Sequence, residues 1–158
     1  MNFKKVTGYD NVNLPKRQTE HSAGYDIESA EDISIQPFET LLIKTGVKCE
    51  IPEGKWLGLY MRSSISLKRN LVMTNSVGVI DKDYYNNEDN EGHIHIMVTN
   101  LSDKVQTVKQ GERIAQCILQ LYYLASNDNA TGKRVGGFGS TSKTTEDWER
   151  GIKNGNNL

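Results

Sequence analysis

Short apolar runs with the chemistry of β-strands recur along this chain, and turn residues separate them. They cover residues 40–51, 56–61, 105–108 and 114–124, while residues 93–98 alternate between polar and apolar positions as a half-buried strand does. Glycine and proline turns follow several of these runs. Strands at this spacing predict an all-β sandwich, barrel or jelly roll, with the long run at 114–124 as a central strand.

Helical periodicity is scarce, and we expect one short helix over residues 64–70. Towards the C-terminus the chain becomes polar, then rich in glycine, then polar again. This change in composition predicts a β domain at 1–124, a flexible glycine-rich C-terminal arm at 125–142 and a polar tail at 143–158.

The composition fits one globular domain and excludes other classes of protein. The 158 residues are 36% apolar and 25% charged, a mixture too rich in β-branched residues for disorder. The net charge of −1 excludes a nucleic-acid binder that acts through bulk positive charge. It leaves room for a local cationic pocket that binds a small anion.

Several features concern location and metal binding. No apolar stretch approaches the roughly 20 residues of a membrane span, and residues 1–5 lack the apolar run of a signal peptide. Cys49 and Cys117 lie in apolar, strand-like runs, which favours two reduced thiols in a cytoplasmic protein over a disulfide. The three histidines and two cysteines form no cluster at zinc spacing.

Residues 134–142 form the segment with the most distinctive chemistry. Its glycines let backbone N–H groups turn toward one anion, and its hydroxyls together with Arg134 add donors that suit phosphate. Phe138 stands in a segment without apolar periodicity, so stacking on a planar ligand is its natural use. A flexible Gly/Ser linker is the alternative.

Two further segments carry side chains that suit a phosphorylated ligand. In residues 61–66, Ser63 and Ser64 stand where a strand opens into a helical turn, which can bind an anion or form an ordinary N-cap. In residues 74–84, Asp81 follows two β-branched residues, so it emerges from a strand and suits a general base. A hairpin with polar ends is the alternative.

Taken in order, five segments resemble the five motifs of the homotrimeric dUTPases. They are AGYD at 23–26, RSS at 62–64, NSVGVIDKDY at 75–84, GERIAQ at 111–116 and GGFGST at 136–141. The resemblance implies a distorted jelly roll of the β-clip type, whose trimer builds three sites between subunits. It also implies Mg²⁺-dependent hydrolysis of dUTP to dUMP and pyrophosphate, which limits uracil incorporation into DNA and supplies dUMP.

The resemblance implies roles for individual residues. Asp81 matches the carboxylate that activates water for attack on the α-phosphorus, Asp26 an acid that holds the metal's water shell, and Tyr84 the ring under the deoxyribose. The residues matched to reading of the base are Asn75, Gly78, Val79, Ile80 and His95. Those matched to contacts with phosphates or water are Arg62, Ser63, Ser64 and Gln116. Those matched to the arm that closes over the nucleotide of another subunit are Arg134, Phe138, Gly139, Ser140 and Thr141.

The chain departs from the family pattern after Tyr84, where residues 85–91 expand a short turn before Gly92. This polar loop lengthens a hairpin or alters access and subunit contacts, and it is the best candidate surface for an unidentified protein partner. Arg134 stands one residue nearer to Phe138 than is common, and His93 is expected in a surface or turn position.

Two alternatives remain open at this point. The dCTP deaminases share the fold, but their active glutamate matches Met97 here, which can neither activate water nor protonate a base. A non-catalytic nucleotide-binding or regulatory module would be expected to lose the carboxylate or the glycine arm, and both are present. We expect neither nucleic acid nor membrane as a direct partner.

Overall fold

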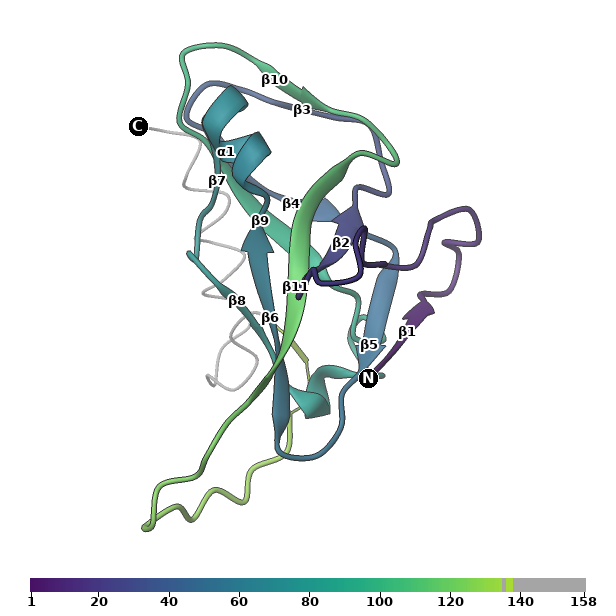
Figure 1. Cartoon of the computed structure of the whole chain (residues 1–158), viewed down its shortest axis with the longest axis vertical. Coiled ribbons are helices and arrows are strands. Elements are labelled where there is room, and N and C mark those ends of the chain that lie inside the picture. The colour runs from purple at the N-terminus through teal and green to yellow at the C-terminus, as the bar shows by residue number, and fades with distance from the viewer. Residues whose placement is uncertain (135, 138–158) are drawn as a thin grey trace.

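The regular elements of the described residues are almost all β-strands, which pair antiparallel with their neighbours (Figure 1). The structure, a computed structural model, describes residues 1–134, 136 and 137. Its strands are β1 (Asn2–Lys5), β2 (Tyr25–Glu28), β3 (Ile33–Ile35), β4 (Thr40–Lys44), β5 (Val47–Glu50), β6 (Lys55–Met61), β7 (Leu71–Met73), β8 (Gly78–Ile80), β9 (His95–Asn100), β10 (Gln106–Val108) and β11 (Arg113–Leu121). The helical elements of this part of the chain are α1 (Ser63–Arg69) and the 3₁₀ turn η1 (Lys82–Tyr84).

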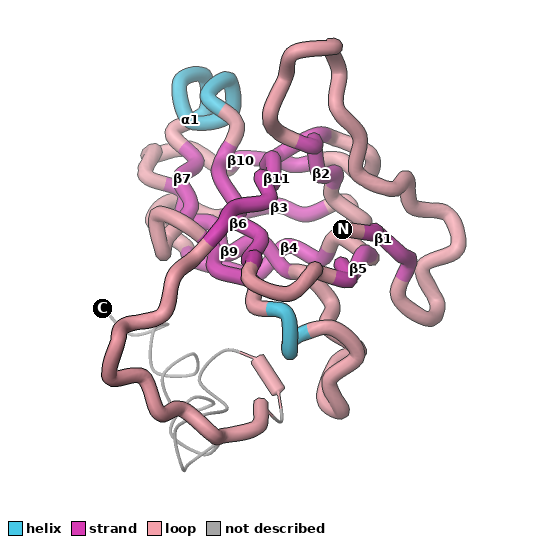
Figure 2. Tube along the Cα trace, turned by 60° about the horizontal axis from the view of Figure 1, so that its bottom comes forward, coloured by secondary structure: helices cyan, strands magenta, loops and turns pink. Residues whose placement is uncertain are grey.

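Two larger sheets hold most of these strands, in the orders β2-β11-β6-β8 and β4-β9-β7. The pairs β1-β5 and β10-β3 form two smaller sheets beside them (Figure 2). Apolar side chains of both larger sheets meet in one core, including Leu57 and Leu59 from β6 and Ile96 and Val98 from β9. The expected all-β fold with one short α-helix is therefore confirmed for the described residues.

The predicted strands are found with revised limits. The run at 40–51 divides into β4 and β5 at Gly46, whose φ of +69° suits glycine. A Cβ there would lie 2.6 Å from the ring of Tyr9, which closes the position to any side chain. The alternation at 93–98 is confirmed in β9, although that strand begins at His95 and its buried positions continue to Asn100.

Strand β11 is central, as predicted, because it pairs with β2 on one side and β6 on the other. The prediction that it extends to Leu124 is wrong, since the strand ends at Leu121. Tyr123 is 90% exposed and Leu124 68% exposed, so these apolar residues lack the burial that would hold them in a sheet. Cys49 and Cys117 are buried free thiols, and burial raises the pKa of Cys49 to about 12.

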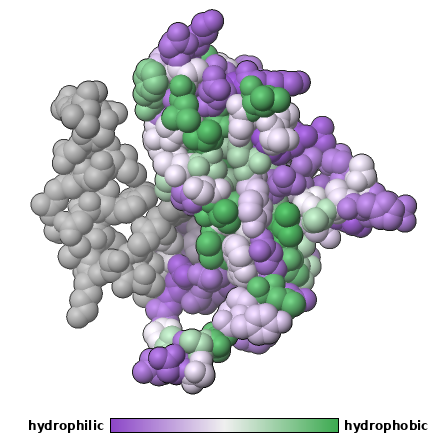
Figure 3. Space-filling view, turned by 60° about the vertical axis from the view of Figure 1, so that its left-hand side comes forward, coloured by the Kyte–Doolittle hydropathy of each residue, from purple (hydrophilic) through white to green (hydrophobic). Residues whose placement is uncertain are grey.

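The surface mixes apolar and polar residues, as the face in Figure 3 shows. Large apolar side chains that are exposed include Leu67, Val79 and Leu121. Within residues 1–134 and 136–137, no helix is both long and apolar enough to span a membrane.

Candidate functional site

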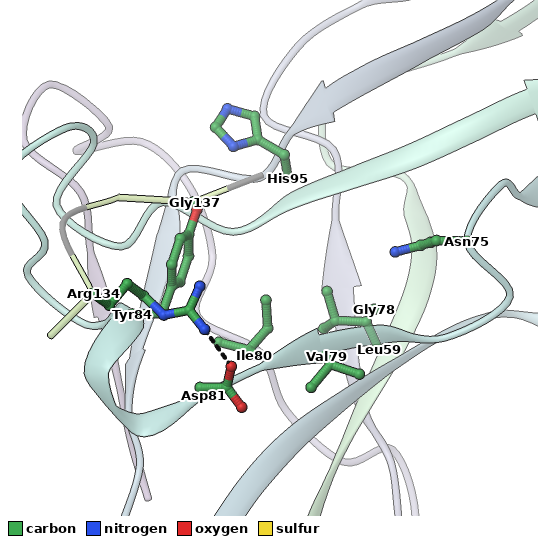
Figure 4. A pocket seen from close by; sticks show the side chains of 10 residues that line it. All are labelled: Leu59, Asn75, Gly78, Val79, Ile80, Asp81, Tyr84, His95, Arg134 and Gly137. Carbon is green, nitrogen blue, oxygen red and sulfur yellow. Dashed lines mark hydrogen bonds and ion pairs between the residues drawn. The ribbon is translucent and has the colours of Figure 1, made fainter. Parts of the chain in front are cut away.

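A pocket of about 180 Å³ opens where β8 ends and η1 begins. Its lining residues are Leu59, Asn75, Gly78, Val79, Ile80, Asp81, Tyr84, His95, Arg134 and Gly137. Figure 4 shows Arg134 and Tyr84 on one side of this space and Asn75 on the other, with Ile80 between them. We call it the Tyr84 pocket. It brings together all six residues expected to read the base and the sugar.

The segment before Asp81 does not form the paired hairpin that was the alternative for residues 74–84. Strand β7 pairs with β9 and β8 pairs with β6, so residues 74–77 cross from one sheet to the other. The crossing is tight, because Ser76 has a φ of +61° and its N–H donates to the carbonyl of Met73 at 3.0 Å. Asn75 therefore reaches the pocket from between two sheets.

Strand β8 supplies a backbone wall, because Gly78 packs closely on the neighbouring strand. A Cβ on Gly78 would lie 3.0 Å from the Cβ and Cδ1 atoms of Leu59. Val79 is 59% exposed, so the strand that leads to Asp81 is less buried than its β-branched residues suggested. Asp81 follows in extended conformation, with its side chain 46% exposed.

Tyr84 is only 6% exposed, and both hydrogen-bonding directions of its hydroxyl are used. The hydroxyl donates to the carbonyl of His93 at 2.8 Å and accepts from Nδ2 of Asn90 at 2.9 Å. Burial raises the pKa of Tyr84, so the phenol stays protonated and can serve as this donor.

His93 is not a surface or turn residue as expected, because it is 6% exposed. Its Nε2 accepts a hydrogen bond from the N–H of Gly46 at 2.8 Å, which needs a neutral ring. Burial is the main cause that lowers its pKa to about 4. The ring centroid of His95 lies 4.2 Å away, and burial lowers the pKa of His95 as well.

The arm reaches the pocket of its own chain at Arg134 and Gly137. The guanidinium of Arg134 binds Asp81 at 2.5 Å and Asp83 at 2.9 Å, as Figure 4 shows for Asp81. A Cβ on Gly137 would lie 2.7 Å from Cε2 of Tyr84, so the arm backbone runs directly against the ring. Four expected arm residues lie outside the described residues: Phe138, Gly139, Ser140 and Thr141.

The other predicted residues gather in a second place, which we call the Asp26 cluster. Asp26 binds Nε of Arg62 at 3.3 Å through one oxygen and NH1 of Arg113 at 3.0 Å through the other. Gln116 lies opposite Asp26 in the β2–β11 ladder. The ordinary N-cap considered for Ser63 is wrong, because Arg62 is the N-cap residue of α1 and makes no side-chain cap hydrogen bond.

The Tyr84 pocket and the Asp26 cluster lie at opposite ends of β6. Ile80 pairs with Leu57 near the start of that strand, whereas Arg62 directly follows its end. A strand of seven residues is roughly 20 Å long. Asp81 and Arg62 are thus separated by most of the length of β6.

The described residues contain no group of three or more His, Cys, Asp or Glu side chains that could hold a metal by themselves. Asp26 fits an indirect role, because its oxygens already accept from two guanidinium groups and keep lone pairs for a metal-bound water. Mg²⁺ usually keeps several waters and binds through substrate phosphates. The donor set therefore fits Mg²⁺ that is carried on a nucleotide.

Sequence reasoning missed several residues of both places. Leu59 lines the pocket, and Arg113 binds Asp26. Arg113 was missed because its partner lies on another strand, β2. Asn90 was missed because nothing in a polar loop distinguishes one asparagine from the next.

Comparison with known proteins gives a consistent result. The family model of the dUTPases matches residues 10–142. The deoxyuridine 5′-triphosphate nucleotidohydrolase of Lactococcus lactis subsp. lactis (strain IL1403) is 50% identical over 143 residues, which cover 88% of this chain and 95% of that protein.

Solved structures agree with the sequence relatives. The crystal structure of a dUTPase from Streptococcus mutans matches with a TM-score of 0.78 and 43% identity, over 80% of this chain and all (100%) of that one. A mutant dUTPase from phage phi11 of S. aureus matches with a TM-score of 0.67 and 25% identity, over 83% and 96% of the two chains. That structure reveals the coordination of a structural Mg(II) ion.

Proposed function

The chain belongs to the dUTPase family and hydrolyses dUTP to dUMP and pyrophosphate, and we propose that Asp81 is the general base of this reaction. The observation that carries the proposal is the half-exposed carboxylate at the mouth of the Tyr84 pocket, beside Arg134. A carboxylate in that position can take a proton from water as the water attacks the α-phosphorus. Phosphoryl transfer otherwise needs mainly positioning and charge stabilisation.

The uracil is read by backbone and amide groups. Gly78, Val79 and Ile80 present a strand edge to the pocket, and Asn75 and His95 line it from other elements. A thymine methyl group would clash with a backbone pressed against C5 of the base. Cytosine would leave fixed donors and acceptors mispaired, and mispaired buried polar groups are costly.

The sugar is selected by Tyr84. Its ring is buried and lines the pocket next to Asp81. A ring packed against C2′ of the deoxyribose leaves no room for a ribose hydroxyl. Selection against UTP is therefore steric.

The phosphates are held by the Asp26 cluster of a neighbouring copy of the chain. Arg62, Ser63, Ser64 and Gln116 supply the contacts. The length of β6 supports this assignment, since it separates these residues from Asp81 within one chain. A homotrimer with shared sites is the assembly that the family resemblance implies, in which one heterologous contact repeats until the ring closes.

The arm at 125–142 closes over the bound nucleotide and excludes water. Phe138 stacks on the base, while Gly139, Ser140 and Thr141 donate to the phosphates. Arg134 exchanges its partners Asp81 and Asp83 for the phosphates when the nucleotide binds. This exchange leaves Asp81 free to act on water.

Mg²⁺ bound to the phosphates supplies positive charge to the triphosphate, and Asp26 orders water around it. The Mg(II) ion of the phage phi11 relative supports the metal, although that ion is described as structural.

A substrate panel tests the proposal. The purified chain is incubated with dUTP, dTTP, dCTP and UTP, each with and without Mg²⁺, and pyrophosphate and ammonia are measured. We expect pyrophosphate from dUTP with Mg²⁺ and no ammonia from dCTP. Equal turnover of dTTP or UTP would refute the proposed roles of β8 or Tyr84.

A further inference from the structure

The loop at 85–91, which expands the turn after Tyr84, is closed by its own side chains. Oδ1 of Asn87 accepts from the N–H groups of Asp89 at 3.0 Å and Asn90 at 3.1 Å. Nδ2 of Asn87 donates to the carbonyl of Tyr84 at 2.8 Å and to Oδ1 of Asn90 at 2.9 Å. The same oxygen of Asn90 accepts from the N–H of Gly92 at 3.0 Å. These bonds hold the amide of Asn90 in one orientation.

The loop is also tied to the β domain at its base. Nζ of Lys48 on β5 donates to Oδ1 of Asn86 at 2.7 Å and to Glu91 at 2.9 Å. The hydroxyl of Thr7 donates to the same oxygen of Glu91 at 3.1 Å, and these bonds lower the pKa of Glu91. Both ends of the loop are therefore anchored.

Asn90 joins this loop to the hydroxyl of Tyr84, whose ring lines the nucleotide pocket. Nδ2 of Asn90 donates to that hydroxyl at 2.9 Å, and the hydroxyl donates to the carbonyl of His93 at 2.8 Å. His93 is itself buried and bound to Gly46. A phenol held on both sides of its oxygen cannot swing about its side-chain torsions without breaking two hydrogen bonds.

We propose that Asn90 is a positioning residue that fixes the ring of Tyr84 and thereby sets the preference for 2′-deoxynucleotides over ribonucleotides. The inference rests on the proposed role of Tyr84 as the steric selector of the sugar. A ring that can tilt leaves room for a 2′-hydroxyl, whereas a tethered ring does not. The loop at 85–91 is thus a device for sugar selection, because it delivers the amide that holds the ring.

The test compares kcat/KM for dUTP and UTP in Asn90→Ala and in the parent chain. We expect the dUTP:UTP ratio to fall between about threefold and tenfold, the range that one hydrogen bond supports. The fall should come mainly from faster UTP hydrolysis. Glu88→Ala is the matched control, since Glu88 is exposed in the same loop and should leave the ratio unchanged. An unchanged ratio in a folded Asn90→Ala protein would overturn the proposal.

A double-mutant cycle separates positioning from a general effect on the loop. Tyr84→Phe removes the hydroxyl that Asn90 binds, so Asn90→Ala should have no further effect on the ratio in that background. An equal effect in both backgrounds would show that Asn90 acts through the loop fold, and would overturn the proposal.

Asn90→Asp keeps an oxygen for Asn87 and Gly92 and replaces the N–H donor by a charged acceptor. The single proton of the Tyr84 hydroxyl can then go to that acceptor or to the His93 carbonyl, so the variant leaves the ring one hydrogen bond in place of two. It therefore tests the contact even if the alanine variant unfolds, and we expect the ratio to fall here as well; no change would overturn the proposal. Tyr84→Ala distinguishes failure of the steric role proposed for Tyr84 from failure of the positioning role proposed for Asn90. If it leaves the ratio unchanged, the steric role of Tyr84 fails; if it collapses the ratio while both Asn90 variants do not, only the present inference fails.

Discussion

The Tyr84 pocket and the Asp26 cluster hold their residues in opposite ways. Around Tyr84 the pocket depends on neutral groups, since Tyr84 and His93 are each 6% exposed and joined by a hydrogen bond through the His93 carbonyl. The ion pair of Asp81 with Arg134 is the charged part of its lining. The cluster depends on charge, with two guanidinium groups on one carboxylate. Neutral groups whose hydrogen bonds are all made cannot rearrange without a large cost in free energy, which suits the recognition of a base and a sugar. Charged groups can exchange partners, which suits the binding of phosphates.

The two places also lie apart in the fold, since Asp81 and Arg62 stand near opposite ends of β6, a strand roughly 20 Å long. This separation is the reason for proposing that two copies of the chain each contribute one half of a site.

The largest expected effect is that of removing the proposed general base, Asp81. Asp81→Asn should lower kcat by about 10² to 10⁴-fold, because it keeps the shape of the side chain and removes its basicity. Affinity for a non-hydrolysable dUTP analogue, measured by calorimetry, should change little. Asp83→Asn is the control, since Asp83 also binds Arg134 and has no proposed role in proton transfer. Turnover near that of the parent chain in Asp81→Asn would contradict the assignment.

Mixing two inactive variants tests whether the half-sites come from different chains. Asp81→Asn damages the pocket and Arg62→Ala damages the cluster, so each alone should be nearly inactive. Trimers formed at random by co-refolding equal amounts of the two variants should together regain about a quarter of the parent activity, the share of all sites that pair two undamaged halves. No recovery in verified mixed oligomers would mean that both halves act within one chain.

A smaller effect is expected where the arm passes the pocket. A Cβ on Gly137 would meet the tethered ring of Tyr84 at 2.7 Å, so Gly137→Ala should lower kcat/KM for dUTP by about tenfold. A Cβ on Gly136 would instead meet the end of the Asp89 side chain, which can turn away. Gly136→Ala should therefore cost less, and the reverse ranking in steady-state kinetics would contradict a fixed ring.

Lowering the pH is expected to have the smallest effect on catalysis, because it acts on the stability of the fold. Because the pKa of His93 falls to about 4 in the folded chain, the unfolded chain binds more protons between that value and about 6.5. Stability should therefore fall as pH drops through this window, by roughly 1 to 3 kcal/mol. Urea denaturation at pH 7 and pH 4.5 measures the change.

A histidine substitution identifies the group responsible. His93→Gln should make the dependence of stability on pH shallower, because glutamine does not titrate, and should leave the contribution of His95, whose pKa burial also lowers. His21→Gln, at an exposed histidine, should leave the dependence as it is. An equally steep loss of stability in His93→Gln would assign the acid effect to other groups.

Features that depend on neighbours in the chain were predictable. The alternation in β9, the buried run in β11 and the short helix α1 each follow from residues close in sequence. The order of the five motifs was likewise enough to indicate the family. Predictions failed where a distant partner decides: residues 74–77 cross between sheets because β7 and β8 find different partners, β9 and β6.

The sequence by itself determined that this chain forms a β protein with the side chains of a dUTP hydrolase, because strand periodicity and motif residues are local properties. Only the tertiary structure decided that His93 is buried and neutral, that Asn90 holds the hydroxyl of Tyr84, and that Asp81 and Arg62 stand at opposite ends of β6. The physical reason is that burial, hydrogen-bond partners and distances arise from pairing between strands far apart in the chain.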